Sequence, residues 1–321
     1  MLFIDAVRQW RDDALSRHRK RLTVGTVRKE LSYLNHHVLA HIPADTMLED
    51  MGKYHNRLVR DYCSARWQES GLSHLTQEGT LRAIGYVLNN HHDDNGNILY
   101  PVRWNRDYMD IPTASYKKRP AYTSEQVSKI MELAMLAKQR NPREHGVYWL
   151  IYNVMAGTGL RMSEVLALRV ESFDKDRLII SERVYQGSIG EPKTDSSRRA
   201  VDLCPYLIDL LNIQKTIQIE KDIPLLLSRP NGGLIAHQDL YDDSLYPILL
   251  EADIPDGYGT HAFRRFRTTH LKLREVPEAL IAFWLGWKPT PTMANYYSRV
   301  TSDIEWRQTW AKRVGIGFDG I

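Results

Sequence analysis

The stretch TGLRMSEVLAL at residues 158–168 is the most informative part of the sequence. An apolar run with helical spacing, residues 148–155, precedes it, and Gly157 and Gly159 are expected to break the helix there. An apolar pattern of helical period resumes after Arg161. We therefore expect Arg161 at the start of a helix, directly after a tight turn.

Length and composition favour two folded domains. The chain has 321 residues, of which 43% are hydrophobic, enough for two cores of common size. Its formal charge of +4 permits nucleic acid as a partner without requiring it. The cysteines, Cys63 and Cys204, are too few for a disulfide framework or a thiolate metal site, which suits a reducing compartment.

The sequence contains no expected targeting or membrane segment. Its start, MLFID, reaches Asp5 before the hydrophobic core of a signal peptide develops. No later apolar run approaches the ~20 residues of a membrane-spanning helix. We therefore expect a soluble, cytoplasmic protein with no membrane partner.

Helical spacing and prolines divide the chain. From residue 23 to about 90 apolar residues recur at helical spacing, which predicts a helical bundle in the N-terminal third. Pro112 and Pro120 flank a polar, basic stretch, and Thr123 then offers a helix N-cap. We expect an N-terminal domain over 1–111, a basic linker over 112–121 and a second domain over 122–321.

The second domain is predicted to be mostly helical with a small antiparallel sheet. Residues 177–181 have strand character, residues 187–190 are turn-like, and residues 199–203 alternate. Residues 192–194 are expected near a hairpin tip. The predicted fold class is therefore mainly α: a helical bundle followed by a mixed, mostly helical domain.

The segment HHDDNGN at residues 91–97 contains side chains that bind metals. It also carries an Asn-Gly turn signal, and its potential ligands lack the spacing of a metal site. A structural loop is therefore favoured over a metal site.

Two basic runs are candidates for contacts with DNA phosphates. They are Arg17, Arg19, Lys20 and Arg21, and Lys117, Lys118 and Arg119. Either run taken alone is explained equally well as a solvated helix face or an exposed linker.

Several side chains suit attack on a phosphodiester without a metal ion. The reaction needs an in-line nucleophile, neutralisation of charge on the phosphate and a proton for the departing oxygen. Arginine offers a planar fork of donors that stays charged, so Arg161 and Arg264 are candidates to bracket the non-bridging oxygens. His261 shares a helix face with Arg264 and can accept or donate the transferred proton.

Lys193 is the candidate general acid. The 5′-oxygen leaves poorly without a proton, and an ammonium group near several arginines has a lowered pKa. A tyrosine nucleophile, Tyr296 or Tyr297, would store the bond energy as a phosphotyrosyl ester, so the strand can be resealed without ATP. No metal and no cofactor are expected.

Each of these residues also has a structural explanation. Arg161 can pair with Glu164 at helix spacing, and His261 can be a satisfied residue at a helix start. Lys193 can be a solvated hairpin lysine. Trp287 and the tyrosines can be core aromatics in a chain with 8 tryptophans and 17 tyrosines. Only the order and spacing of the set favour the catalytic interpretation.

Together the motifs resemble those of the tyrosine recombinase, or phage integrase, family across both domains. Residues 158–168 resemble the first arginine box of the family, and HAFRRFRTTHL at residues 261–271 resembles the second. Lys193 falls in the family's β-hairpin, before Arg198 and Arg199. The helical N-terminal third is similar in length and character to the family's core-binding domain.

Two positions differ from the usual family pattern. Where most members carry Leu-Gly-His, this chain has LGW at residues 285–287, and the indole N–H of Trp287 can still donate a hydrogen bond to phosphate. Tyr296 and Tyr297 stand at the two spacings found in the family. Tyr297 is the preferred nucleophile, because the sequence after it resembles the family's usual ending, and Tyr296 is the alternative.

The resemblance implies a site-specific recombinase that cleaves and rejoins double-stranded DNA through a 3′-phosphotyrosyl intermediate, for integration, excision or cointegrate resolution of a mobile element. It also implies a homo-tetramer on two sites, with or without an accessory DNA-binding protein. The alternatives are a type IB topoisomerase-like enzyme and a catalytically idle DNA-binding protein of the same fold. The apolar stripe of the segment at about 302–321 is expected to dock on a neighbouring subunit, as in the family, or to pack within its own chain.

Overall fold

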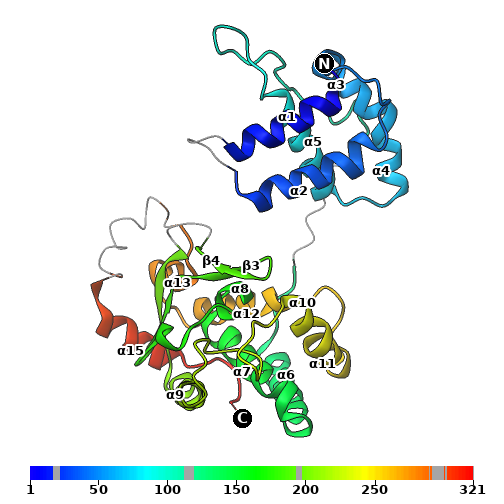
Figure 1. Ribbon diagram of the computed structural model, residues 1–321. Helices are drawn as coiled ribbons and strands as arrows, with labels where there is room; N and C mark the ends of the chain where they lie inside the picture. Colours follow the sequence, from blue (N-terminus) through cyan, green and yellow to red (C-terminus); the bar gives the residue numbers. More distant parts are fainter. Residues whose placement is uncertain are drawn as a thin grey trace. The chain divides into compact units, whose positions relative to one another are not determined.

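The computed structural model describes residues 1–16, 22–111, 119–192, 197–288, 290, 300 and 302–320, without the side chains of residues 143–145. The chain divides into two compact units, Met1–Lys117 and Lys118–Ile321 (Figure 1). Each unit has a hydrophobic core of its own, and the two cores share no residue.

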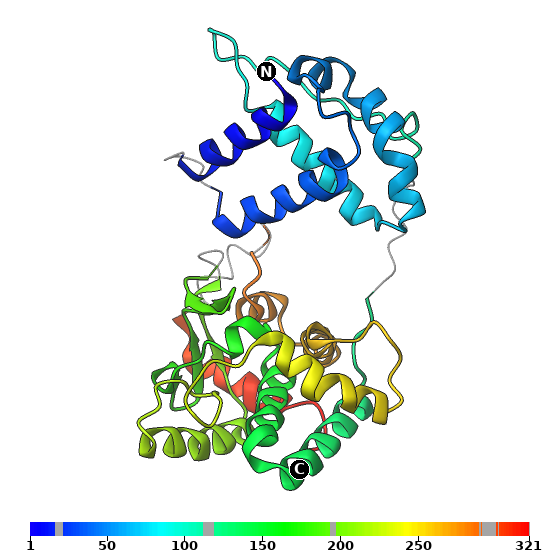
Figure 2. The same ribbon diagram turned by 45° about the vertical axis from the view of Figure 1, so that its right-hand side comes forward.

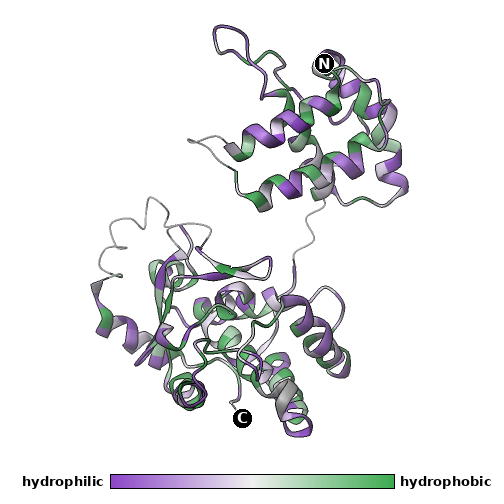
Figure 3. Ribbon diagram, viewed as in Figure 1, coloured by the Kyte–Doolittle hydropathy of each residue, from purple (hydrophilic) through white to green (hydrophobic). Residues whose placement is uncertain are grey.

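The first unit is a bundle of helices. Its elements are α1 (Phe3–Ser16), α2 (Val24–Leu34), η1 (Asn35–Leu39), α3 (Leu48–Val59), η2 (Arg60–Ser64), α4 (Ala65–Glu69) and α5 (His74–Leu88). The N-caps Thr23 and Ser73 start α2 and α5, and each hydroxyl oxygen accepts a backbone N–H at 3.2 Å. Hydrophobic and hydrophilic stretches alternate along α1 and α2, as helices with one buried face require (Figure 3).

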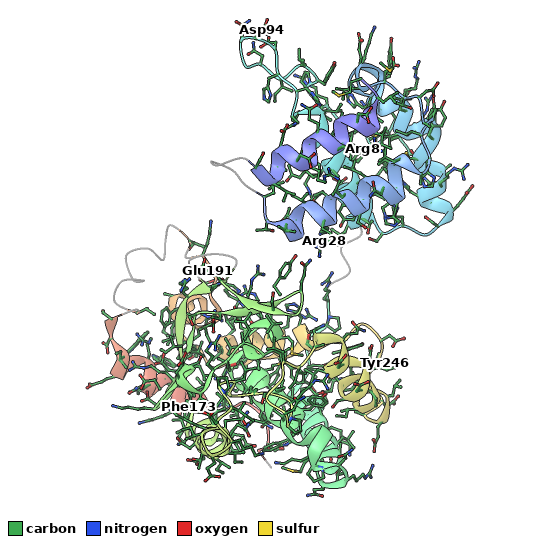
Figure 4. The ribbon with its side chains drawn as sticks, viewed as in Figure 1. Arg8, Arg28, Asp94, Phe173, Glu191 and Tyr246 are labelled. Atoms are coloured by element: carbon green, nitrogen blue, oxygen red, sulfur yellow. The ribbon has the colours of Figure 1, made fainter. Side chains whose placement is uncertain are left out.

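The predicted loop at residues 91–97 follows α5. The Asp93 carboxylate accepts the backbone N–H groups of Asn95 and Asn97 at 2.9 and 2.8 Å, which closes a turn. Asp94 lies at the outer end of this loop (Figure 4). Across the residues that the structure describes, no group of three or more His, Cys, Asp or Glu is arranged to hold a metal ion.

The second unit places helices around two small sheets. Its helices are α6 (Ser124–Arg140), α7 (Pro142–Thr158), α8 (Met162–Val165), η3 (Val170–Ser172), α9 (Pro205–Glu220), α10 (His237–Leu240), η5 (Tyr241–Leu245), α11 (Tyr246–Glu251), α12 (Thr260–Leu273), α13 (Glu278–Leu285) and α15 (Ile304–Val314). Its strands are β1 (Phe173–Asp174), β2 (Arg177–Ile180), β3 (Arg183–Tyr185), β4 (Ser188–Gly190) and β5 (Arg199–Asp202). The predicted fold class, mainly α with a small antiparallel sheet, is confirmed.

Helix α7 lies at the centre of this unit. Helices α6 and α12 both pack against it (Figure 2), and the rings of Tyr152 on α7 and Phe263 on α12 stack at 5.8 Å. The predicted N-cap Thr123 starts α6, in a capping box with Gln126. The packing holds the C-terminal end of α7 beside the first turns of α12.

Only one of the two glycines, Gly159, breaks the helix as the sequence predicts. Gly157 does not break α7, because it lies inside the helix where a Cβ atom would come within 2.7 Å of Leu207. The helix ends at Thr158, and Gly159 follows with a φ of +73°, which favours glycine. The tight turn before Arg161 therefore needs only one of the two glycines.

The strands form a three-stranded antiparallel sheet, β1–β2–β5, and a separate hairpin, β3–β4. The hairpin turns at Gln186 and Gly187, whose φ angles of 51° and 78° are those of a two-residue hairpin turn. The expected turn over 187–190 is thus partly wrong, because residues 188–190 form the returning strand. Of the predicted hairpin tip at 192–194, residues 193 and 194 lie outside the described part of the chain.

Both cysteines, Cys63 and Cys204, are buried and free. None of the helices in the described ranges combines the length and apolar character that crossing a membrane demands.

Candidate phosphate-binding site

Arg264 lies at the junction of three elements. It is on the first turns of α12 and is only 8% exposed. One guanidinium nitrogen, Nη1, donates to the carbonyl of Gly159 after α7 at 2.8 Å, and Nη2 donates to the carbonyl of Leu285 at the end of α13. Two elements far apart in sequence therefore fix the direction of this guanidinium.

Burial and neighbouring positive charge both act on Arg264. Burial, followed by the nearby charge of Arg161, lowers the pKa of Arg264 to about 9. The group still carries its charge at neutral pH. A bound anion would relieve the repulsion between the two arginines, so this part of the unit favours a negatively charged ligand.

Arg161 is the N-cap residue of α8. Its Nη1 donates to Oε1 of Glu164 at 2.7 Å, and its backbone N–H donates to Oε2 of the same carboxylate at 2.9 Å. The pairing that the sequence offered as a structural explanation is therefore present. The Arg161 side chain remains 35% exposed, so a ligand can also reach it.

Glu164 contacts a second arginine, Arg199 on β5. Nη1 and Nη2 of Arg199 lie 3.2 and 3.0 Å from the two carboxylate oxygens, and both side chains are almost fully buried. Burial alone raises the pKa of a carboxyl group, but pairing with Arg199, and then with Arg161, holds the pKa of Glu164 below its ordinary 4.5. Glu164 is therefore an ionised link between the two arginines.

Arg199 was not among the candidate site residues chosen from the sequence. It carried one signal, since it stands two residues before the inward-facing Val201 on an alternating strand. A charged residue in an inward position needs a buried partner. The sequence alone does not say which residue that partner is.

His261 lies on the first turn of α12, three residues before Arg264. Its side chain is exposed. Partial loss of solvent around the ring, followed by the charges of Arg264 and Arg265, lowers the pKa of His261 below its ordinary 6.5. The imidazole is therefore mainly neutral near pH 7 and able to accept a proton.

Trp287 follows the left-handed residue Gly286, whose φ is +63°. The backbone N–H of Trp287 donates to the carbonyl of Ala282 at 2.9 Å, and that of Gly286 donates to Phe283 at 3.1 Å, which closes the end of α13. Trp287 is partly buried against the core of its unit. The carbonyl of Trp284 in the same last turn accepts Nε of Arg199 at 2.7 Å.

Several predicted site residues lie outside the described residues. They are Lys193, Tyr296, Tyr297, Arg17, Arg19, Lys20, Arg21, Lys117 and Lys118. Arg119 is described and is exposed. The described candidates Arg161, His261 and Arg264 come together around the ends of α7 and α13, and Trp287 follows α13 directly.

Helix α15 packs within its own unit. Arg307, Ala311 and Val314 form its buried face, and Trp306 and Trp310 pack against the same core. Nε of Arg307 lies 2.8 Å from Oδ2 of Asp202 on β5, in a buried ion pair. This single chain thus buries one face of the helix against its own unit, and docking on a neighbouring subunit stays a prediction.

No family model matches the chain, and neither does any curated protein. Among solved structures, it is similar to the Tn1549 transposon integrase in complex with transposon right end DNA, with a TM-score of 0.66 and 18% identity over 92% of this chain and 95% of that one. The XerH site-specific recombinase bound to a palindromic difH substrate gives 0.55 and 16%, over 94% and 92%. A lambda integrase dimer bound to a COC′ core site gives 0.62 and 11%, over 92% and 77%.

Proposed function

We propose that this chain, which has the mainly helical, two-domain fold of the tyrosine recombinases, is a site-specific DNA recombinase. In this proposal it cleaves and rejoins DNA through a covalent 3′-phosphotyrosyl intermediate, and it integrates, excises or resolves a mobile element. The supporting observation is the convergence of Arg161 and Arg264, from separate arginine motifs, at the ends of α7 and α13. Two cations held by backbone carbonyls and a buried carboxylate suit a phosphate that gains negative charge during the reaction.

Each candidate has one role in this mechanism. The phenolic oxygen of Tyr297, or alternatively of Tyr296, attacks phosphorus, and His261 accepts its proton. Arg161, Arg264 and Trp287 donate to the non-bridging oxygens. The bond from phosphorus to the 5′-oxygen breaks, and Lys193 supplies the proton that this oxygen needs as it leaves. The ester that remains is attacked by a 5′-hydroxyl when the strand is rejoined, so no cofactor takes part.

The partner in this proposal is double-stranded DNA. The domain over residues 1–111 and the catalytic domain over 122–321 would hold the duplex, with the basic runs at residues 17–21 and 117–119 contacting phosphates. Four protomers would bring two sites together, with an accessory DNA-binding protein as a further component. Such a protein works in the cytoplasm, associated with the nucleoid when bound to DNA.

A trapped adduct tests the proposal. A target duplex is first selected from a random pool by binding, and half-sites with a nick just beyond the cleavage position are then prepared. The short 5′-hydroxyl fragment diffuses away after cleavage, so the covalent complex accumulates. We expect a 3′-phosphotyrosyl adduct with the natural protein and with Tyr296→Phe, and none with Tyr297→Phe.

Other outcomes have distinct meanings. Loss of the adduct in Tyr296→Phe alone would move the nucleophile by one residue. Binding without an adduct in the natural protein would support the idle DNA-binding alternative and contradict the proposal. Relaxation of supercoiled DNA that carries a single site, without joining of two sites, would instead indicate a type IB topoisomerase-like activity.

A further inference from the structure

The carboxylate of Glu164 is shared by an exposed arginine and a buried one. Oε1 accepts Nη1 of Arg161 at 2.7 Å and Nη1 of Arg199 at 3.2 Å. Oε2 accepts the backbone N–H of Arg161 at 2.9 Å and Nη2 of Arg199 at 3.0 Å. Glu164 is 4% exposed, so the balance of charge around it is set by these two partners rather than by water.

This balance decides how much charge Arg161 presents to a ligand. One carboxylate against two guanidinium groups leaves a net positive charge in the group of three. Without Arg199, Glu164 would neutralise Arg161 alone, and the charge of Arg161 would be cancelled where it faces solvent. Arg264 would then be the remaining net cation among Arg161, Glu164 and Arg264.

Arg199 is placed so that it cannot bind a ligand itself. Its side chain is 1% exposed. Nε donates to the Trp284 carbonyl at 2.7 Å, and Nη1 also donates to the Ser197 carbonyl at 2.9 Å. A Cβ atom on Gly286 would approach Nη1 to 2.9 Å, so the chain before Trp287 lies directly against this guanidinium.

We propose that Arg199 is a positioning residue: by neutralising Glu164 from the buried side and holding the last turn of α13, it keeps the positive charge of Arg161 available to the scissile phosphate. This inference rests on the proposed recombinase function for its substrate. Its physical content, a charge balance around Glu164, also applies to any phosphate bound at the site.

Three variants separate charge from packing. Arg199→Gln removes the charge, Arg199→Lys keeps the charge but loses the two-pronged geometry, and the double variant Arg199→Gln with Glu164→Gln removes both charges of the buried pair. The single-turnover rate of adduct formation on the nicked half-site is measured at saturating protein. Thermal melting of each variant is recorded beside it, so that the rates are compared only between folded proteins.

We expect the cleavage rate to fall at least about tenfold in Arg199→Gln, because a buried counter-charge is lost. Arg199→Lys should keep most of the rate, and the double variant should recover most of what Arg199→Gln loses. A half-site with a neutral methylphosphonate at the cleavage position should also narrow the difference between the natural protein and Arg199→Gln, since that linkage carries no charge to neutralise. If the role of Arg199 is purely structural, the double variant should cleave no faster than Arg199→Gln. The ratio of rates between the natural protein and Arg199→Gln should then be the same on the neutral linkage as on the natural phosphate.

The affinity for inorganic phosphate, measured by calorimetric titration, is a readout that needs no nucleophile. This affinity should fall in Arg199→Gln and return in the double variant. If the natural protein forms no adduct while phosphate binding follows this order, the proposed function fails and the charge balance stands. Equal phosphate affinity in the natural protein, Arg199→Gln and the double variant would overturn the role of Arg199. So would equal losses of cleavage rate in Arg199→Lys and Arg199→Gln at the same folded fraction.

Discussion

At the scale of single residues, His261 offers a direct test of proton transfer. Its pKa is lowered by partial desolvation and by Arg264, Arg265 and Arg161, and His237 acts in the same direction. A lowered pKa keeps the imidazole neutral down to a more acidic pH than an ordinary histidine, whose pKa is 6.5. The ring can therefore accept a proton in a range where an ordinary histidine is mostly protonated. We expect the second-order rate of adduct formation to fall toward acidic pH, with a midpoint below 6.5.

Subsaturating DNA is the right condition, because the rate then reports the pKa of the free protein. His261→Asn should lower the rate and remove the acidic limb, since no imidazole remains at this position to take up the proton. A midpoint above 6.5, or an acidic limb that persists in His261→Asn, would assign the titration to another group.

Arg161, His261 and Arg264 were selected from the sequence by their order along the chain and by the resemblance of residues 158–168 and 261–271 to two arginine motifs. Only His261 and Arg264 are related by local helix spacing. Sequence reasoning did not select Arg199, since the choice between Arg198 and Arg199 as the inward residue depends on the register of β5. Arg199 pairs with Ile180 across the sheet and faces inward with Val201, whereas Arg198 is exposed. The partners of Arg199, on α8 and α13, are brought there by tertiary packing.

At the scale of elements, the end of α13 connects Arg199 with two candidate site residues, Arg264 and Trp287. Its last carbonyls hold Arg199 and Arg264, and the turn at Gly286 leads to Trp287. In Gly286→Ala, alanine would have to adopt a left-handed φ of +63°, which is unfavourable for it, and its Cβ atom would collide with Nη1 of Arg199. We expect a loss of stability greater than the backbone cost of about 1–2 kcal/mol, together with slower cleavage.

Gly187→Ala, in the turn of the β3–β4 hairpin, is the matched control for the backbone cost of Gly286→Ala. Its φ is +78°, but nothing lies within 4 Å of the added Cβ atom, so only the backbone cost of about 1–2 kcal/mol applies. Chemical denaturation and single-turnover cleavage are measured for both variants. Equal losses of stability, or unchanged cleavage in Gly286→Ala, would mean that the turn does not position the arginines.

The same elements explain what the sequence did not determine. Gly157 and Gly159 look alike in sequence, yet one lies inside α7 against Leu207 and the other ends the helix. Close packing between helices and a left-handed turn both favour glycine, and only the tertiary structure distinguishes them. The N-cap at Thr123 was predicted correctly because its hydrogen bonds are local.

At the scale of the whole molecule, the two separate cores set the expected unfolding behaviour. The helical character of the first unit followed from apolar spacing along the chain. The order of strands in the second unit did not, because pairing between β2 and β5 joins residues far apart in sequence. All candidate catalytic residues belong to the second unit, so the stability of that unit limits the chemistry.

Trp67 and Trp284 allow the two cores to be perturbed separately. Each indole is almost fully buried, and each Nε1 donates one hydrogen bond, from Trp67 to the His37 carbonyl at 2.9 Å and from Trp284 to Asp202 at 2.7 Å. Replacing such a residue with alanine costs about 3–5 kcal/mol. We expect Trp67→Ala to lower the midpoint temperature of one calorimetric transition and to leave the other unchanged. Trp284→Ala should lower the midpoint of the other transition instead, and it should abolish adduct formation. If both substitutions shift one common transition by the same amount, the chain unfolds as a single cooperative body, and the independence of the two cores is contradicted.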